Sequence, residues 1–264
     1  MIDRIKAELS RDLDYIEIHI LSDWHIGDAN CKMDEIRAEI EEIKNKSNAF
    51  AICNGDLMNN ATKSSISDFY AETMTPQDQV DMLVELLSPI KDKILMITRG
   101  NHEARTNRES GVDLSAVIAG MLGCLPKYSQ DGGVLFVKFG HESRGRKDRS
   151  GLPRRQQYTI YVTHGAGGGR KEGAKAIRLA DMASIVDTDV YVHSHTHLPM
   201  IMKQAYFRVN LQKTKVEPVE KLFVNSAGKL DYGGYGQSKE FKPNSTSNPI
   251  ILLNGTKREV GVRL

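Results

Sequence analysis

Short apolar runs alternate with amphipathic segments along the first 200 residues of the chain. Residues 15–21 and 49–53 are rich in β-branched and apolar side chains, which predicts two buried strands. The segment between them predicts an amphipathic helix, because its apolar residues recur at helical spacing: Met33, Ile36, Ile40 and Ile43. A strand, a helix and a second strand therefore open the chain.

The same alternation continues toward residue 193. Thr75 followed by Pro76 is typical of a helix start, and the next residues carry an apolar stripe: Val80, Leu83, Val84 and Leu87. Further elements are predicted in the order strand 94–98, helix 112–122, strands 134–139 and 158–162, helix 172–185 and strand 190–193. Residues 199–264 predict a β-rich segment with turns.

The order of these elements predicts an α/β fold. Because polar clusters follow the predicted strands directly, we expect a functional site at the carboxyl ends of those strands. The sequence contains no low-complexity linker and no internal repeat. We therefore expect one domain over residues 1–264, with residues 199–264 as its β-rich C-terminal part.

Composition narrows the class of protein. Hydrophobic residues make up 40% and charged residues 27% of the 264 residues, as in water-soluble globular proteins. No apolar run approaches the length of a membrane span, and the N-terminus lacks the apolar core of a signal peptide. Three cysteines argue against a disulfide framework, so we expect a cytoplasmic protein without a membrane partner. The net charge of +2 does not by itself imply a polyanionic partner.

Five clusters of candidate metal ligands follow predicted strands. They are Asp23-Trp24-His25, Asn54-Gly55-Asp56, Gly100-Asn101-His102-Glu103, His164 and the pair His195 and His197. Each cluster alone is weak, because Asp, Asn and Gly also form ordinary turns. Together they indicate a site for divalent ions, since imidazole and carboxylate suit zinc, manganese, iron and related metals.

The last cluster lies in the segment VYVHSHTHLPM, residues 190–200, which contains three histidines at a spacing of two. In an extended chain His193, His195 and His197 would share one face. Their spacing leaves open whether all three bind metal or whether one is a bystander.

The clusters in this order resemble the motifs of the calcineurin-like metallophosphoesterases. The family pattern appears here as DWH, GD, GNHE, THG and SHTH, and the resemblance covers about residues 16–200. It implies a four-layer α-β-β-α sandwich and a two-metal phosphoesterase. The one departure is Ser194, where the family usually has glycine, and its Cβ matters if that position needs a positive φ.

The resemblance also implies metal-binding roles. One metal would be held by Asp23, His25 and His197, and the other by Asn101, His164 and His195. Asp56 would bridge the two, so that a hydroxide shared by both ions could attack the phosphorus. We expect Mn²⁺, although Fe, Zn and Ni tolerate the same ligands.

Other positions receive roles around the substrate. By the resemblance, His102 faces the phosphate, as a catalytic residue alongside Asp56, and either stabilises the transition state or protonates the leaving oxygen. Glu103 either orients His102 through its ring N–H or is a plain surface carboxylate. The expected substrate contacts are Asn101, Arg105 and Arg170. His193 matches no ligand position and is expected to be a hydrogen-bonded neighbour, and Trp24 is expected to pack beneath the metals.

The substrate is less clearly indicated. The opening ILSDWHIGD resembles the first motif of Mre11/SbcD-type nucleases, without their long cap region. RGNHEAR resembles the serine/threonine phosphatase form, but the Asp-Arg-Gly of those enzymes is absent. The basic stretch 144–155 fits either a phosphate-backbone contact or a solvated hairpin tip, and the tyrosines and glycines at 232–236 fit either base stacking or an exposed turn.

These features favour phosphodiester hydrolysis, with DNA, RNA or a nucleotide as substrate. A phosphomonoesterase acting on a small metabolite or a phosphoprotein is the alternative. A non-catalytic protein-binding scaffold is more remote, because every expected ligand position is filled. The oligomeric state is not indicated by the sequence.

Overall fold

The computed structural model describes most of the chain. The described residues are 1–10, 12–63, 65, 69–140, 156–167, 169, 171–238, 240 and 242–264. No helix among them is long and apolar enough to cross a membrane.

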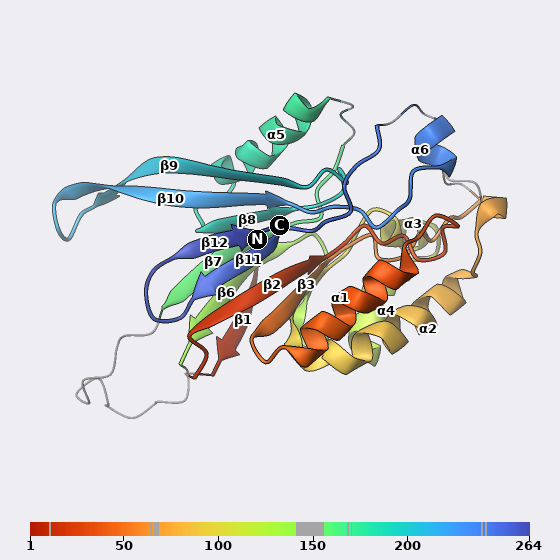
Figure 1. Cartoon of the computed structure of the whole chain (residues 1–264), viewed down its shortest axis with the longest axis horizontal. Coiled ribbons are helices and arrows are strands. Elements are labelled where there is room, and N and C mark those ends of the chain that lie inside the picture. Colours follow the sequence, from red (N-terminus) through yellow and green to blue (C-terminus); the bar gives the residue numbers. More distant parts are fainter. Residues whose placement is uncertain are drawn as a thin grey trace.

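Two six-stranded sheets form the centre of the molecule (Figure 1). Sheet A contains, in spatial order, β1 (Asp3–Leu9), β6 (Gly133–Phe139), β7 (Gln157–Val162), β8 (Val190–His193), β10 (Lys215–Asn225) and β9 (Met200–Asn210). Sheet B contains β12 (Val260–Arg263), β11 (Ile250–Asn254), β2 (Tyr15–Leu21), β3 (Ala49–Asn54), β4 (Ile94–Thr98) and β5 (Tyr128–Ser129). Strands from after residue 199 thus pair within both sheets.

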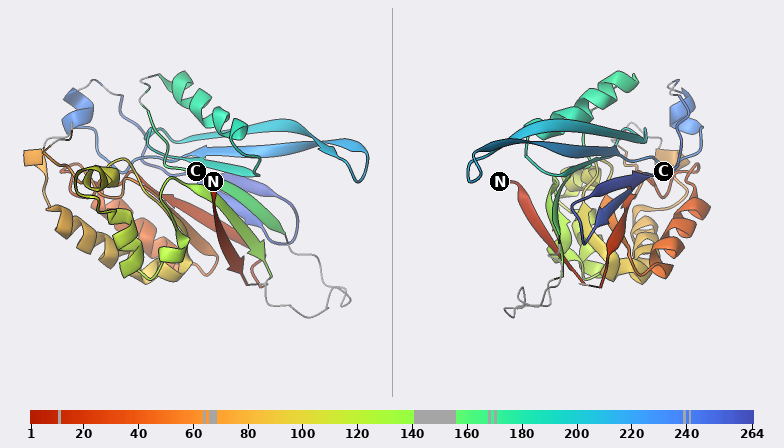
Figure 2. Two further views of the ribbon diagram at one scale, coloured as in Figure 1. Left: turned by 180° about the vertical axis from the view of Figure 1, so that it is seen from behind. Right: turned by 60° about the vertical axis from the view of Figure 1, so that its left-hand side comes forward.

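Helices cover the outer faces of the sheets. They are α1 (Met33–Asn45), α2 (Pro76–Leu87), α3 (Glu103–Ser110), α4 (Leu114–Met121), α5 (Glu172–Asp181) and the short α6 (Gly234–Ser238). The short 3-10 helices are η1 (Phe69–Ala71), η2 (Ser88–Lys93), η3 (Leu125–Lys127) and η5 (Met182–Ser184). Figures 1 and 2 show α1, α2 and α4 beside sheet B and α5 above sheet A.

Three apolar layers hold this arrangement together. The inner faces of the sheets pack on each other, as the alternation in β2 requires: Ile16, Ile18 and Ile20 are fully buried there. The opposite face of sheet B packs on α1, α2 and α4, and the outer face of sheet A packs on α5. The structure therefore confirms the α-β-β-α sandwich.

The predicted start of α2 is confirmed in detail. The Thr75 side chain accepts a hydrogen bond from the Asp78 N–H, and the Asp78 carboxylate accepts one from the Thr75 N–H. Pro76, which lacks an N–H, occupies the first turn where none is needed.

The sequence pattern does not predict β1 and α3, nor the shorter β5 and α6. β1 lies in a charged N-terminal segment, and its only pattern is the alternation of Ile5, Ala7 and Leu9, which face the core. α3 has the polar sequence EARTNRES and buries only Glu103, so it has no apolar stripe to indicate a helix.

Candidate metal centre

Parallel strands bring the five motif clusters to one edge of the molecule. β2, β3 and β4 run parallel in sheet B, and β7 and β8 run parallel in sheet A. Each of these strands ends just before one cluster, so the side chains that follow them meet between the two sheets. The structure brings together all seven residues that were predicted as metal ligands.

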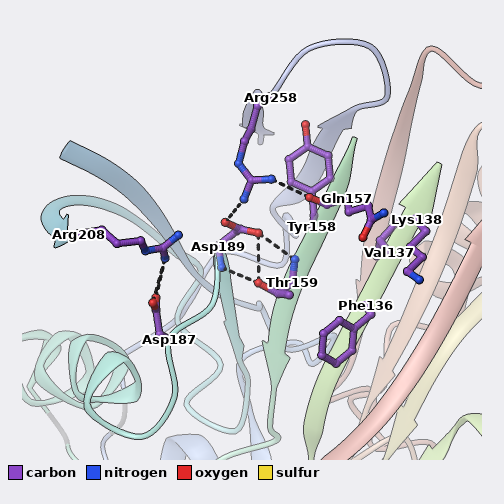
Figure 3. A pocket seen from close by; sticks show the side chains of 10 residues that line it. All are labelled: Phe136, Val137, Lys138, Gln157, Tyr158, Thr159, Asp187, Asp189, Arg208 and Arg258. Carbon is purple, nitrogen blue, oxygen red and sulfur yellow. Dashed lines mark hydrogen bonds and ion pairs between the residues drawn. The ribbon is translucent and has the colours of Figure 1, made fainter. Parts of the chain in front are cut away.

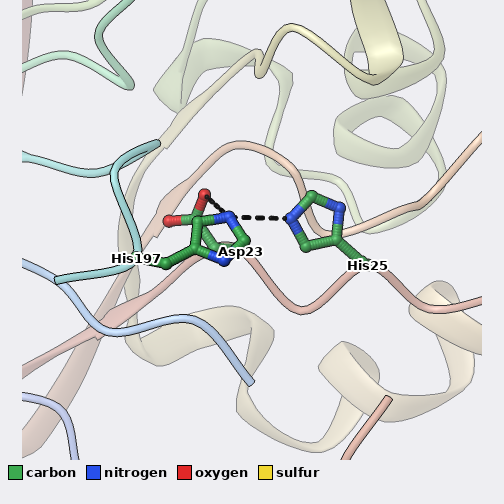
Figure 4. A group of neighbouring side chains, drawn as sticks. All are labelled: Asp23, His25 and His197. Atoms are coloured by element: carbon green, nitrogen blue, oxygen red, sulfur yellow. Dashed lines mark hydrogen bonds and ion pairs between the residues drawn. The ribbon is translucent and has the colours of Figure 1, made fainter. Parts of the chain in front are cut away.

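The first group consists of Asp23, His25 and His197 (Figure 4). Nε2 of His197 lies 3.3 Å from Oδ1 of Asp23 and 3.1 Å from Nε2 of His25. Asp23 is fully buried and His25 nearly so. Three donor atoms from the two loops after β2 and β8 thus converge on one point.

The second group lies around His164. Its Nε2 is 3.2 Å from Oδ2 of Asp56 and 3.2 Å from Oδ1 of Asn101. The ring of His195 completes the group, which has donor atoms within 4.8 Å of one another. The backbone N–H of His195 also donates to Oδ2 of Asp23, at 3.1 Å, and so joins the two groups.

Asp56 lies between these groups. It belongs to the second group and also to a set with His25 and His102. Its Oδ1 accepts the backbone N–H of His102 at 2.8 Å, and its Oδ2 faces His164. This is the position that a bridging carboxylate requires.

Five of the expected ligands have a left-handed backbone. Residues with side chains rarely adopt a positive φ, which costs of the order of 1–3 kcal/mol each. The φ values lie between 50° and 66° for Asp23, His25, Asp56, His195 and His197. Such strain concentrates at functional sites. Ser194 is not among these residues, so its Cβ meets no such penalty.

Two glycines allow the loops to approach each other closely. A Cβ on Gly55 would lie 2.5 Å from the backbone nitrogen of Gly100, and a Cβ on Gly100 would lie 2.1 Å from that of Asp56. Gly55 also has a φ of +75°. The glycines of the GD and GNHE motifs are therefore needed for packing beneath Asp56.

Glu103 does not orient His102, so that expectation is wrong. Its carboxylate instead accepts backbone N–H groups from Asp56, Leu57, Met58 and Gly100, at 2.8–3.1 Å. Glu103 is buried, so it is not a surface carboxylate either. Burial raises the pKa of Glu103 to about 7. Its place at the start of α3 turns it toward the loop after β3, which it fixes in place.

His102 is held by other partners. Its Nδ1 lies 2.7 Å from the carbonyl oxygen of Asn59, which can only accept, so Nδ1 carries the proton. Nε2 of the neutral ring then accepts from Nη2 of Arg105 at 3.0 Å. The His102 ring packs edge-on against His25, with centroids 4.4 Å apart. Burial lowers the pKa of His102, which favours this neutral form.

The charges at the centre suit a cation. Burial acts to raise the pKa of Asp23, but His197 outweighs it and lowers that pKa to about 2. Burial acts on Asp56 in the same direction, but His164 and His102 hold its pKa well below the usual range. Burial also opposes the charged form of His164, yet Asp56 raises its pKa to about 10, so without a metal this imidazolium is itself the cation beside Asp56, and a bound metal would displace its proton. Two ionised carboxylates therefore lie buried among imidazoles.

The donor set fits divalent metals on its own chemistry. Burial lowers the pKa of His25 well below its ordinary value and that of His195 to about 4, so both rings keep a lone pair at neutral pH. Oδ1 of Asp23 is buried without a hydrogen bond, although Nε2 of His197 is nearby. A cation between the donor atoms would satisfy this oxygen.

His193 is a hydrogen-bonded neighbour, as predicted. Its Nδ1 lies 2.8 Å from Oδ1 of Asn225, and the ring is buried. Gly165 packs on the other side, because a Cβ there would lie 2.1 Å from Nε2 of His193. Trp24 is fully buried in the helix-side core, as expected for a residue beneath the site.

The segment after β10 was not identified as part of the site. A Cβ on Gly228 would lie 2.6 Å from Nδ1 of His197, and the N–H of Lys229 donates to the Asp23 carbonyl oxygen at 2.9 Å. β10 runs parallel to β8, so its carboxyl end reaches the same edge. The polar run Asn225-Ser226 after an apolar strand was the signal in the sequence.

The expected substrate contacts are placed differently: Asn101 lies in the second group, Arg105 lies beside His102, and Arg170 is outside the described residues. Arg105 donates to the carbonyl oxygen of Asn59 as well as to His102. Arg170 and the basic stretch 144–155 lie outside the described residues. The neighbours of that stretch, Gly140 and Gln156, adjoin the far ends of β6 and β7 from His164.

The tyrosines and glycines at 232–236 only partly match the expectation. Instead of a turn, residues Gly234–Ser238 form α6. Tyr232 is half exposed. The side chain of Tyr235 is outside the described part of the chain. Base stacking by this segment stays a prediction.

Ser194 belongs to a buried hydroxyl network that joins the two sheets. Its Oγ accepts from Nδ2 of Asn54 at 2.6 Å and from Oγ of Ser226 at 2.8 Å. Ser22 in turn donates to Ser226 at 2.7 Å, and Thr98 donates to Oδ1 of Asn54 at 2.7 Å. A glycine, the usual residue of the family motif, could not form these bonds.

Replacing Ser194 by Ala should lower the free energy of unfolding by about 1–3 kcal/mol, because Asn54 would keep a buried N–H without its acceptor. Urea denaturation of the two proteins measures this difference. Ser247, which is exposed, provides the matched control as Ser247→Ala. Equal stabilities of the two variants would show that the network does not stabilise the fold.

Comparison with known proteins agrees with this geometry. The family model described as calcineurin-like phosphoesterase matches residues 16–199, well over half of the chain. No curated protein sequence matches the chain.

Solved structures resemble the chain distantly. A metallophosphoesterase from Sphaerobacter thermophilus is 12% identical, with a TM-score of 0.38, and the match covers 92% of this chain and 90% of that one. Vps29 complexed with zinc from Entamoeba histolytica is 10% identical, with a TM-score of 0.38, over 94% and 97% of the two chains. The nuclease MPE from Pseudomonas putida is 12% identical, with a TM-score of 0.36, over 93% and 87%.

Proposed function

The chain belongs to the calcineurin-like phosphoesterase family, and we propose that it is a hydrolase that cleaves phosphodiester bonds with two divalent metal ions. One observation carries this proposal: Asp56 shares one donor set with His164 and His195 and is also grouped with His25, which belongs to the other set, with Asp23 and His197. A single-metal site would need only one of these sets.

The metals would be held as the motifs predict. His197, with Asp23 and His25, would bind one ion, and His164, with its neighbours, would bind the other. When bound, such ions polarise the phosphoryl oxygens and make hydroxide available at neutral pH. We infer Mn²⁺ as the native metal, and Fe, Zn or Ni fit the same ligands.

The residues beside the metals would orient the substrate. Asn101 and Arg105 would contact phosphoryl oxygens, and substrate binding would release Arg105 from Nε2 of His102. That nitrogen would then face the substrate, fixed in direction by the bond between Nδ1 and Asn59. Glu103 would hold the loop that carries Asp56.

The charge balance supports a diester over a monoester. A monoester carries close to two negative charges at neutral pH, because its second pKa is about 6, whereas a diester carries one. The residues after Asp56 are Leu57 and Met58, which are buried, followed by two asparagines. This loop therefore offers no side-chain cation for the second charge, and Arg105 is the described cation that bonds His102.

A comparison of two chromogenic esters in Mn²⁺ tests the proposal. We expect a higher kcat/KM for bis-p-nitrophenyl phosphate than for p-nitrophenyl phosphate. Single-stranded DNA, duplex DNA, RNA and cyclic nucleotides should then be compared, since a nucleic acid or nucleotide is the proposed ester. A preference for the mono-ester would instead favour a phosphomonoesterase, and the absence of both bound metal and hydrolysis would favour a scaffold.

A further inference from the structure

A two-stranded arm extends from sheet A (Figures 1 and 2). β9 and β10 pair over eleven register positions, but β10 pairs with β8 only over Leu222–Asn225. We call residues 207–218, the outer part of this hairpin, the arm. Asn225 lies beside His193, so the arm is at the opposite end of β10 from the metal centre. Isolated two-stranded ribbons are marginally stable in water, so such an arm calls for a partner layer.

One face of the arm continues the apolar core without a layer over it. At the base of the hairpin, Ile201, Leu222 and Val224 pack between the two sheets. Paired residues on alternate positions share this face. Further out it carries Phe207 opposite Pro218 and Val209 opposite Val216.

These outer side chains are exposed to solvent. Phe207 is 80% exposed, Val209 65% and Val216 62%, and Leu211 at the tip is 87% exposed. No second sheet covers them among the described residues. A contiguous apolar patch of this kind marks an interaction site rather than ordinary surface.

The other face of the arm is already occupied by the protein itself. Arg208 donates to both carboxylate oxygens of Asp187, at 2.9 and 3.0 Å, beside a cavity of about 320 Å³ (Figure 3). Lys213 lies 3.6 Å from Glu217. Arg208 and Glu217 on this face are thus paired within the chain.

We propose that the apolar face of the arm packs against the same face of a second copy of this chain, across a two-fold axis. A two-fold contact requires a surface that is complementary to itself, and an apolar ribbon face meets this requirement. Two such faces would stack about 10 Å apart, as the two sheets do at the base of the arm.

The size of the patch agrees with a dimer contact. An exposed aromatic side chain alone offers roughly 150–200 Å². With the neighbouring valines, the proline and Leu211, the face offers on the order of 500 Å² per partner. Two such faces would bury about 1,000 Å² in total, the lower bound for a specific interface, and the polar rim would supply the rest of the roughly 800 Å² per partner of a standard one. The flanking pair Lys203 and Glu220, 3.9 Å apart, would supply part of the polar rim.

Sedimentation equilibrium tests the proposal. The wild-type protein should have about twice the chain mass of 29.5 kDa at micromolar concentration. Phe207→Glu should weaken the dimer on the order of 100-fold, because it places a charge at the centre of the apolar contact. Ile177→Glu, on the exposed side of α5, is the matched control and should leave the dimer intact.

A second variant guards against misfolding. Tyr206 and Val219 are register partners, so an Asn-Gly turn can join them in place of residues 207–218. This shortened protein should be a monomer with wild-type thermal stability and phosphoesterase activity, since the arm is remote from the metal centre. A monomeric wild type, whether or not another protein or a membrane covers the arm, would overturn the proposal. So would a shortened protein that still dimerises.

Discussion

Asp56→Asn is expected to lose one of the two metals and to reduce kcat by on the order of 10³-fold. The carboxylate lies between both donor sets, and an amide offers only one oxygen and no charge. Metal ions contribute several kcal/mol to stabilising the transition state, and each 1.4 kcal/mol or so is a factor of ten in rate. Elemental analysis of the purified protein and initial rates on the bis-ester measure the two effects.

Two controls show whether the effect is specific to the metals. His193→Ala removes a histidine that is bonded to Asn225 and belongs to neither donor set, so it should keep both metals and most of the activity. His195→Ala and His197→Ala should each lose metal and activity. If all three histidine variants lost activity equally, or if Asp56→Asn kept two metals, the assignment of ligands would be wrong.

The fold could be predicted where a local pattern reports on burial. The strands β3 and β4 are largely continuous apolar runs because both of their faces are covered, and β2 alternates isoleucines with Glu17 and His19. β1 is harder to recognise, because its solvent face is charged and its buried residues only alternate with those charges. α3 leaves no pattern, since its position is fixed by Glu103 and the loop after β3 rather than by an apolar face.

The metal ligands could be predicted because the order of the motifs along the chain indicates which side chains meet at the site. The ligand clusters each follow a parallel strand, and parallel strands place such clusters at one edge. The hydrogen-bond partners of Glu103 and His102 could not be predicted in this way. They depend on how the loops of β3 and β4 fit together within hydrogen-bonding distance. No spacing in the sequence encodes that fit.

The buried hydroxyl network shows the same limit. In the sequence, Ser194 is only a departure from glycine, and its Cβ would cost free energy if the position needed a positive φ. The structure gives it a bonding role, because Asn54 from one sheet and Ser226 from the other both reach its hydroxyl. Each donor set combines residues that follow strands of both sheets, so bonds between the sheets help to fix the geometry within each set.

His102→Asn is expected to keep both metals and to reduce kcat by about 10²–10⁴-fold, the usual contribution of a positioned acid–base group. Nε2 of His102 lies 3.0 Å from Nη2 of Arg105 and 3.8 Å from Oδ2 of Asp56, and Asn59 fixes the ring from behind. An asparagine side chain is too short to present a polar atom at that position. To protonate the leaving oxygen, the ring must first take up a proton at Nε2 when the anionic substrate displaces Arg105. With that proton in place, the loss should be larger for alkyl than for p-nitrophenyl esters, because a poor leaving group depends more on protonation.

The geometry also permits a competing role, which the same variant distinguishes. His102 forms a set with His25 and Asp56 that could itself bind a cation, in which case His102→Asn would lose metal. Arg105→Lys helps to separate the two roles. A lysine keeps the charge but not the planar fork that reaches both Asn59 and His102, so it should raise KM and leave metal content unchanged. Unchanged metal in both variants, with turnover lost mainly in His102→Asn, would place His102 at the substrate and Arg105 at its phosphoryl oxygens. Loss of metal in His102→Asn would make this histidine a ligand and leave Arg105 as the nearest donor to the leaving oxygen.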